Sequence, residues 1–121
     1  MALKSMVMEF GTGTDIRGGD YTKAAVRALE NALRHNSITF AQAFDVPRET
    51  MQVKIAIGVA KPDQVDRATV ASVLPYGQAE VTVHQGGMDV PNEAGTDATV
   101  LSNAVVTVYL DLPEDRTQGA A

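Results

Sequence analysis

The stretch Met51-Gln-Val-Lys-Ile-Ala-Ile-Gly-Val-Ala60 decides the fold, because its residues alternate between large aliphatic and small or polar side chains. A period of two is that of a β-strand, with the Val and Ile side chains on one face and Lys54 and Gly58 on the other. The same alternation predicts strands at Ala79–His84 and Asn103–Leu112. The core is therefore expected on the aliphatic face of a sheet.

The remaining segments add helices to this sheet. Alanine and leucine recur at helical spacing after Asp20, a residue type that caps helix N-termini. The other predicted elements are strands at Leu3–Phe10 and Ser37–Phe44, helices at Tyr21–His35 and from Pro62 to Leu74, and a long loop from Gln85 to Thr96. The order β-α-β-β-α-β-β predicts an α+β fold: two layers, a mixed sheet of about five strands, and two helices on one face.

A chain of 121 residues fits one domain, expected at 1–112 with a flexible tail at 113–121. Two helices cover only one face of such a sheet. Because aliphatic strands do not face water on both sides, the second face needs another layer. We therefore expect a homo-oligomer.

Composition excludes several classes of protein. The net charge of −5 and scattered basic residues argue against binding to nucleic acid or an anionic membrane. The chain has no cysteine, hence no disulfide and no thiolate nucleophile, which suits the cytoplasm. We find neither a membrane span nor a signal peptide. Two distant histidines without cysteine make no zinc site, and no cofactor is expected.

A glycine-rich stretch, Gly11-Thr-Gly-Thr-Asp-Ile-Arg-Gly-Gly19, follows the first strand. Glycines between a strand and a helix let backbone N–H groups approach an anion, which Arg17 would clamp. The glycine spacing is neither a dinucleotide fingerprint nor a P-loop. The alternative is a tight turn in which Asp15 bonds its own backbone. The candidate ligand-binding residues here are Gly11, Thr12, Gly13, Thr14, Arg17 and Gly18.

Asp15, Lys54 and His84 are the candidate catalytic residues. Asp15 would act as a base, although a turn-capping role is as good. Lys54 lies among small residues, so it either reaches solvent or lines a polar cleft where its pKa would fall. His84 precedes Gln85, Gly86 and Gly87, which would form a second wall; a surface position at a strand end is the alternative. The acidic loop after them matches no known Mg²⁺ or Ca²⁺ cage.

The segment Gly11–Gly18 resembles a family of uncharacterised bacterial and plant proteins marked by a GxGxDxHG motif. The segments Asp20–Ala25, Pro75-Tyr76-Gly77 and Gly86-Gly87 resemble it as well. The resemblance spans nearly the whole chain and implies no activity, because the family has none assigned. Arg17 stands where the family has histidine.

The element order is also similar to the trimeric α+β chorismate mutase fold and to one repeat of the ring-opening amidohydrolases. That resemblance implies sites between subunits, favours a trimer, and suggests hydrolysis of a cyclic amide or imide if the protein is an enzyme. We therefore expect a small anionic or cyclic amide-like ligand at a subunit interface. The alternative is a noncatalytic sensor or structural homo-oligomer.

Overall fold

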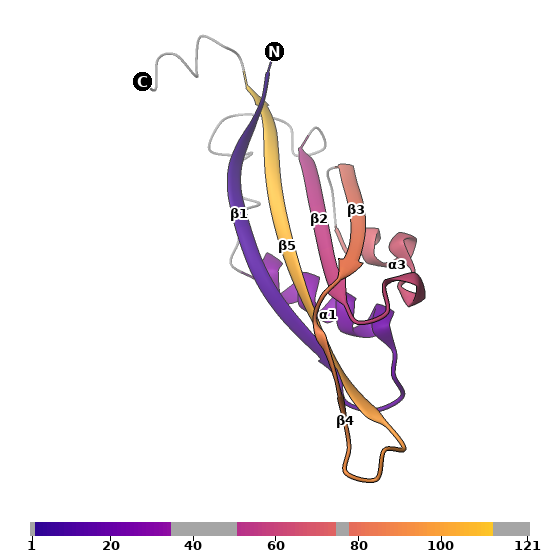
Figure 1. Ribbon diagram of the computed structural model, residues 1–121. Coiled ribbons are helices and arrows are strands. Elements are labelled where there is room, and N and C mark those ends of the chain that lie inside the picture. The colour runs from indigo at the N-terminus through magenta and orange to yellow at the C-terminus, as the bar shows by residue number, and fades with distance from the viewer. Residues whose placement is uncertain (1, 35–50, 75–77, 113–121) are drawn as a thin grey trace.

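The computed structural model describes residues 2–34, 51–74 and 78–112, which form two layers: a five-stranded mixed sheet and two helices against one of its faces (Figure 1). The strands are β1 Ala2–Asp15, β2 Gln52–Val59, β3 Gln78–Gln85, β4 Met88–Pro91 and β5 Ala98–Leu112. The helices are α1 Tyr21–Leu33 and α3 Arg67–Ala71, preceded by the short 3₁₀ turn η2 Pro62–Gln64. The predicted two-layer α+β fold is confirmed.

Strand β5 is the centre of the sheet, whose order is β1-β5-β2-β3. It pairs antiparallel with β1 along nearly its whole length and antiparallel with β2 on its other side. Strands β2 and β3 are parallel, as expected of strands joined by a crossover that carries a helix. Strand β4 pairs with the first residues of β5, so a β4–β5 hairpin extends past the helical layer (Figure 1).

Helix α1 lies against β1 and β5 at very short range, because Gly11 and Gly13 face it. A Cβ atom on Gly11 would collide with the backbone of Ala28 and Ala32, and one on Gly13 with the backbone of Ala24 and Ala28. The helix in turn presents small residues. Ala24, Ala28 and Ala32 are fully buried. The two glycines therefore set the distance between the layers.

The same helix covers part of the outer edge of β1. The Asn31 carboxamide accepts a hydrogen bond from the Thr12 backbone N–H at 3.0 Å, and the Arg27 guanidinium donates to the Thr14 carbonyl at 2.7 Å. Among the described residues these backbone groups have no neighbouring strand, so α1 supplies the partners that a further strand would supply.

The core lies between the layers and is aliphatic. Its largest fully buried side chains are Leu29, Met51, Ile55, Ile57, Val53, Val59, Val70, Val100, Val106 and Val108. Strand β2 alternates as the sequence predicts, with every second residue buried. Among the described residues we find no helix with the length and hydropathy needed to cross a membrane.

The predicted second helix is in fact two short pieces. Val65 is extended, and Asp66 then starts α3, with its carboxylate accepting from the backbone N–H groups of Ala68 and Thr69. Hydrogen bonds from Thr69, through its side chain and backbone, lower the pKa of Asp66. The N-cap at Asp20 is confirmed, since its side chain accepts from Lys23 N–H.

Two predictions are wrong in their limits: the turn after the first strand and the long loop. Strand β1 continues to Asp15, so the predicted turn at residues 11–19 begins only after that residue, where Gly18 and Gly19 have φ of 93° and 61°. The predicted loop from Gln85 to Thr96 contains β4, and β5 starts at Ala98 because Met88–Pro91 pair with it.

Several predictions lie outside the described residues. These are the strand at residues 37–44, the end of the first helix at 35–36, the turn at 45–48, the segment 75–77 and the tail at 113–121. The likeness to the chorismate mutase fold stays a prediction.

Replacing Gly13 by alanine is expected to lower the free energy of unfolding by roughly 3 kcal/mol or more. Overpacking a core typically costs about 1–3 kcal/mol, and here the new methyl group meets helix backbone, which cannot rotate away. Urea denaturation measures the change. The control is Thr12→Ala on the exposed face of the same strand, expected within about 0.5 kcal/mol of the wild type. Equal stability of Gly13→Ala and the wild type would contradict the close approach.

Candidate functional site

The face of the sheet opposite α1 and α3, here called the open face, is left uncovered by the described residues. Strand register arranges its side chains in rows across the strands. The rows, in order along β5 from its C-terminal end, are Gln78–Gln52–Tyr109, Glu80–Lys54–Thr107–Met8, Thr82–Ala56–Val105–Phe10, His84–Gly58–Asn103–Thr12, Met88–Leu101–Thr14 and Val90–Thr99. The first two rows and the His84 row are mainly polar, and the other three are mainly apolar.

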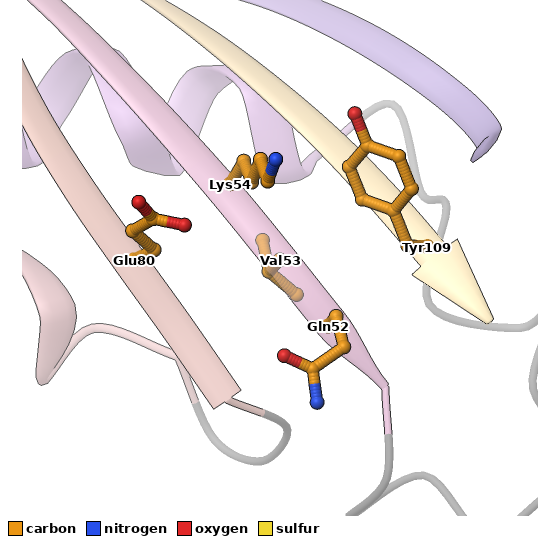
Figure 2. A pocket seen from close by; sticks show the side chains of 5 residues that line it. All are labelled: Gln52, Val53, Lys54, Glu80 and Tyr109. Carbon is orange, nitrogen blue, oxygen red and sulfur yellow. The ribbon is translucent and has the colours of Figure 1, made fainter. Parts of the chain in front are cut away.

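The first two rows form a hollow of about 430 Å³, the Lys54 hollow, lined by Gln52, Val53, Lys54, Glu80 and Tyr109. Figure 2 shows Lys54 on β2 between Glu80 on β3 and Tyr109 on β5. The Lys54 ammonium nitrogen is 5.2 Å from the centre of the Tyr109 ring, within the range of a cation–π interaction. The hollow thus offers a cation, an aromatic ring and a carboxylate.

Lys54 is not held by a carboxylate. The ion pairs within 4.0 Å in the described part of the chain join Asp15 to Lys23 and Arg27, so Glu80 faces Lys54 without forming such a pair. Gln52 donates from Nε2 to Gln78 Oε1 at 3.0 Å. Lys54 is exposed, which answers the question left by the sequence: it reaches solvent at the rim of a shallow polar hollow.

His84 lies on the same face, but four residues further along the strands. A second hollow of about 210 Å³, the His84 hollow, lies there. It is lined by Ala56, Ile57, Gly58, His84, Gln85, Gly86, Asn103 and Val105. Strand rise separates Lys54 from His84 by more than about 12 Å, so one small molecule does not contact both.

Asp15 lies on the other face of the sheet. It is 3% exposed, and its Oδ2 accepts from the Asp20 backbone N–H at 2.9 Å, while its Oδ1 is 3.7 Å from Lys23 Nζ and 4.0 Å from Arg27 Nη1. These contacts fix the start of α1, which is the structural role weighed for it above. Within one chain Asp15, Lys54 and His84 therefore do not converge.

The glycine-rich stretch does not form an anion-binding loop at its first half. Gly11 and Gly13 pack against α1, and Thr12 gives its outward N–H to Asn31. Arg17 instead lines a third hollow, of about 350 Å³, between the turn and the β4–β5 hairpin, with Asp97 as a neighbour in it. The Gly18 N–H donates to Asp97 Oδ2 at 3.4 Å. Gly87, with φ of 57°, makes the turn between β3 and β4.

Three residues of interest were not predicted from the sequence. Tyr109 and Asn103 enter the hollows only through the register of β5 with β2. Tyr21 is buried and donates a hydrogen bond from its hydroxyl to Asp89 Oδ2, joining α1 to β4. The other carboxylate oxygen of Asp89 is buried without a hydrogen-bond partner in the described structure.

The comparisons with known proteins agree with this fold. A model of the family described as conserved hypothetical protein (Lin0512_fam) matches residues 5–108. The chain belongs to this family. The expected membership of an uncharacterised family is thus confirmed. The description of the Lin0512 family names no activity.

A solved structure of a relative supports the same fold. The chain is similar to a crystal structure, at 1.22 Å resolution, of an FtsZ-like protein of unknown function from Nostoc punctiforme PCC 73102. The two share 33% sequence identity with a TM-score of 0.81, over 92% of this chain and 98% of the other. No curated protein matches the chain.

The Tyr21–Asp89 contact predicts a loss of stability at high pH. The hydrogen bond to Asp89 chiefly, then burial and the Asp89 charge, raise the pKa of Tyr21 from 10.0 to about 12. Since the folded-state pKa is the higher one, this contribution is complete below pH 10 and is lost as the pH rises through 12.

Phenolate absorbance during a pH titration measures this effect. The difference between the wild type and Tyr21→Phe is expected to titrate near pH 12, and urea denaturation of Tyr21→Phe should lack the matching decline in stability. A difference spectrum with its midpoint at the ordinary value of 10 would contradict the contact.

Proposed function

We propose that this protein is a homo-oligomer that binds a small anionic molecule on its open face, in the Lys54 hollow, at the seam between copies. The observation that carries the proposal is the Lys54 ammonium, which lies beside an aromatic ring in a hollow of about 430 Å³ and has no carboxylate of the described chain within 4.0 Å.

The groups around Lys54 favour a particular kind of anion. The ammonium would pair with a carboxylate or phosphate, and the Tyr109 ring would pack against a planar ligand. Glu80 on the other side accepts hydrogen bonds only, so it favours a ligand that also carries an N–H or O–H donor. A small planar carboxylate with such a donor satisfies all three groups.

A second copy of the chain is the occupant we propose for the apolar side chains of the open face, with the two hollows left at the seam. Met8, Phe10, Met88 and Val90 are 53%, 62%, 57% and 47% exposed there. From strand spacing and length, the face covers roughly 600 Å² in projection, close to the area that each partner of a standard interface buries, about 800 Å².

The number of copies and the reaction are two finer points of the proposal, and they differ in support. A trimer is what the architectural resemblance implies. Hydrolysis of a cyclic amide or imide has less support, because Asp15 lies on the opposite face from Lys54 and His84. The second candidate function is a noncatalytic structural homo-oligomer, which the four exposed apolar side chains favour without any ligand.

The oligomer is tested by placing a charge on the open face. Light scattering of the wild type at micromolar concentration should give a multiple of 12.8 kDa, and Phe10→Lys should give 12.8 kDa, since a buried unpaired charge opposes association. The matched control is Glu30→Gln, which also raises the net charge by one but lies on the exposed side of α1. A monomeric wild type contradicts the proposal.

The anion site is tested by benzoate binding, with benzyl alcohol as the uncharged analogue. Lys54→Gln is expected to weaken benzoate binding by about tenfold or more, the usual effect of losing a hydrogen bond to a charged group. Calorimetric titration measures the affinity. Lys61→Gln, which removes an equally exposed lysine at η2, should leave it unchanged. Equal loss in both variants, or equal binding of benzyl alcohol, would rule out the Lys54 site.

A further inference from the structure

The side chain of Asn103 lies flat on β2, on a floor made by two glycines. An ideal Cβ atom on Gly58 would collide with Asn103 Oδ1, and one on Gly86 would lie 3.4 Å from the same oxygen and 3.2 Å from Gly58 Cα. Gly58, Gly86 and Asn103 come from β2, the β3–β4 turn and β5. Their backbones thus leave space for one planar carboxamide and fix its position.

This carboxamide makes no hydrogen bond within the described chain, although its neighbours do. Ser102, the preceding residue, donates from its hydroxyl to the Gly58 carbonyl at 3.0 Å. Asn103 is exposed, and its Oδ1 lies against Gly58 and Gly86. The side chain is thus held by packing, while its polar groups have no hydrogen-bond partner in the described chain.

His84 adds a ring nitrogen on the other side of Gly58. Its Nε2 is 2.9 Å from Thr82 Oγ1, within hydrogen-bond distance. Its Nδ1 takes no part in this contact and has no hydrogen-bond partner among the described residues. The Gln85 carboxamide lines the same hollow.

We propose that the His84 hollow binds the polar edge of a single planar ring that carries an N–H beside a C=O. Asn103 would donate to the ring carbonyl and accept from the ring N–H, and His84 Nδ1 would form a hydrogen bond with a further polar group of the ring. Ala56 and Val105 supply apolar contacts for the ring. A hollow of about 210 Å³ is below the usual range for larger ligands, about 300–1,000 Å³, which limits the ligand to one ring.

This site shares the open face with the Lys54 hollow but not its residues. The inference therefore goes beyond the proposed function, and each can hold if the other fails.

Uracil is the probe, and 1,3-dimethyluracil, the same ring without N–H donors, is its control. In an NMR titration of the full chain, uracil should shift the backbone amide signals of Gly58 and Gly86, and 1,3-dimethyluracil should bind about tenfold more weakly or worse. Absence of uracil shifts, or equal shifts with both compounds, overturns the proposal.

Two variants assign the binding to Asn103. Asn103→Ala should weaken uracil binding by about tenfold, and Asn103→Asp, which keeps the shape but loses the N–H donors, should weaken it similarly. Lys54→Gln should leave uracil binding unchanged, and Asn103→Ala should leave benzoate binding unchanged. Unchanged uracil affinity in both Asn103 variants contradicts the proposal, whichever way benzoate behaves at Lys54.

Discussion

The approach of helix backbone to strand backbone at Gly11 and Gly13 is the constraint on which the rest of the structure depends. The facing side of α1 carries Ala24, Ala28 and Ala32, which are fully buried. Asp15 then accepts a hydrogen bond from the backbone N–H of Asp20, the residue that caps the helix, and Tyr21 donates to Asp89 on β4. One spacing between two layers thus positions the helix, the turn before it and the hairpin beside it.

The same arrangement places all of the described helical cover on one side and leaves the chemistry on the other. The open face carries two polar regions, the Gln52 and Lys54 rows and the His84 row, and each coincides with a hollow. Lys54 and Asn103 share a property there: each is placed by its neighbours and yet has no ionic or hydrogen-bonded partner among the described residues. The comparisons leave the function of this face open, in the Lin0512 family and in its solved relative alike.

Much of the fold was predictable because its signals are local. Alternation in β2 and the cap at Asp20 depend on neighbours in sequence, and both were predicted correctly. The glycines at 11 and 13 were misread, since a turn and a close packing contact both require glycine and only the helix position separates them. The sequence indicated His84, Gln85 and Gly86, which line the His84 hollow. It did not indicate Asn103 or Gly58, because their pairing with each other and with His84 depends on the register between distant strands.

The hydrogen bonds that Asn31 and Arg27 make to the outer edge of β1 affect how copies of the chain can associate. A sheet rich in valine can pair with strands of other copies at an unprotected edge, and repeated pairing of that kind would produce an open-ended fibre. Because the backbone groups of Thr12 and Thr14 already have hydrogen-bond partners, this part of β1 cannot pair with a strand of another copy. Association through the open faces leaves these hydrogen bonds intact, so an assembly formed in that way does not extend through this edge.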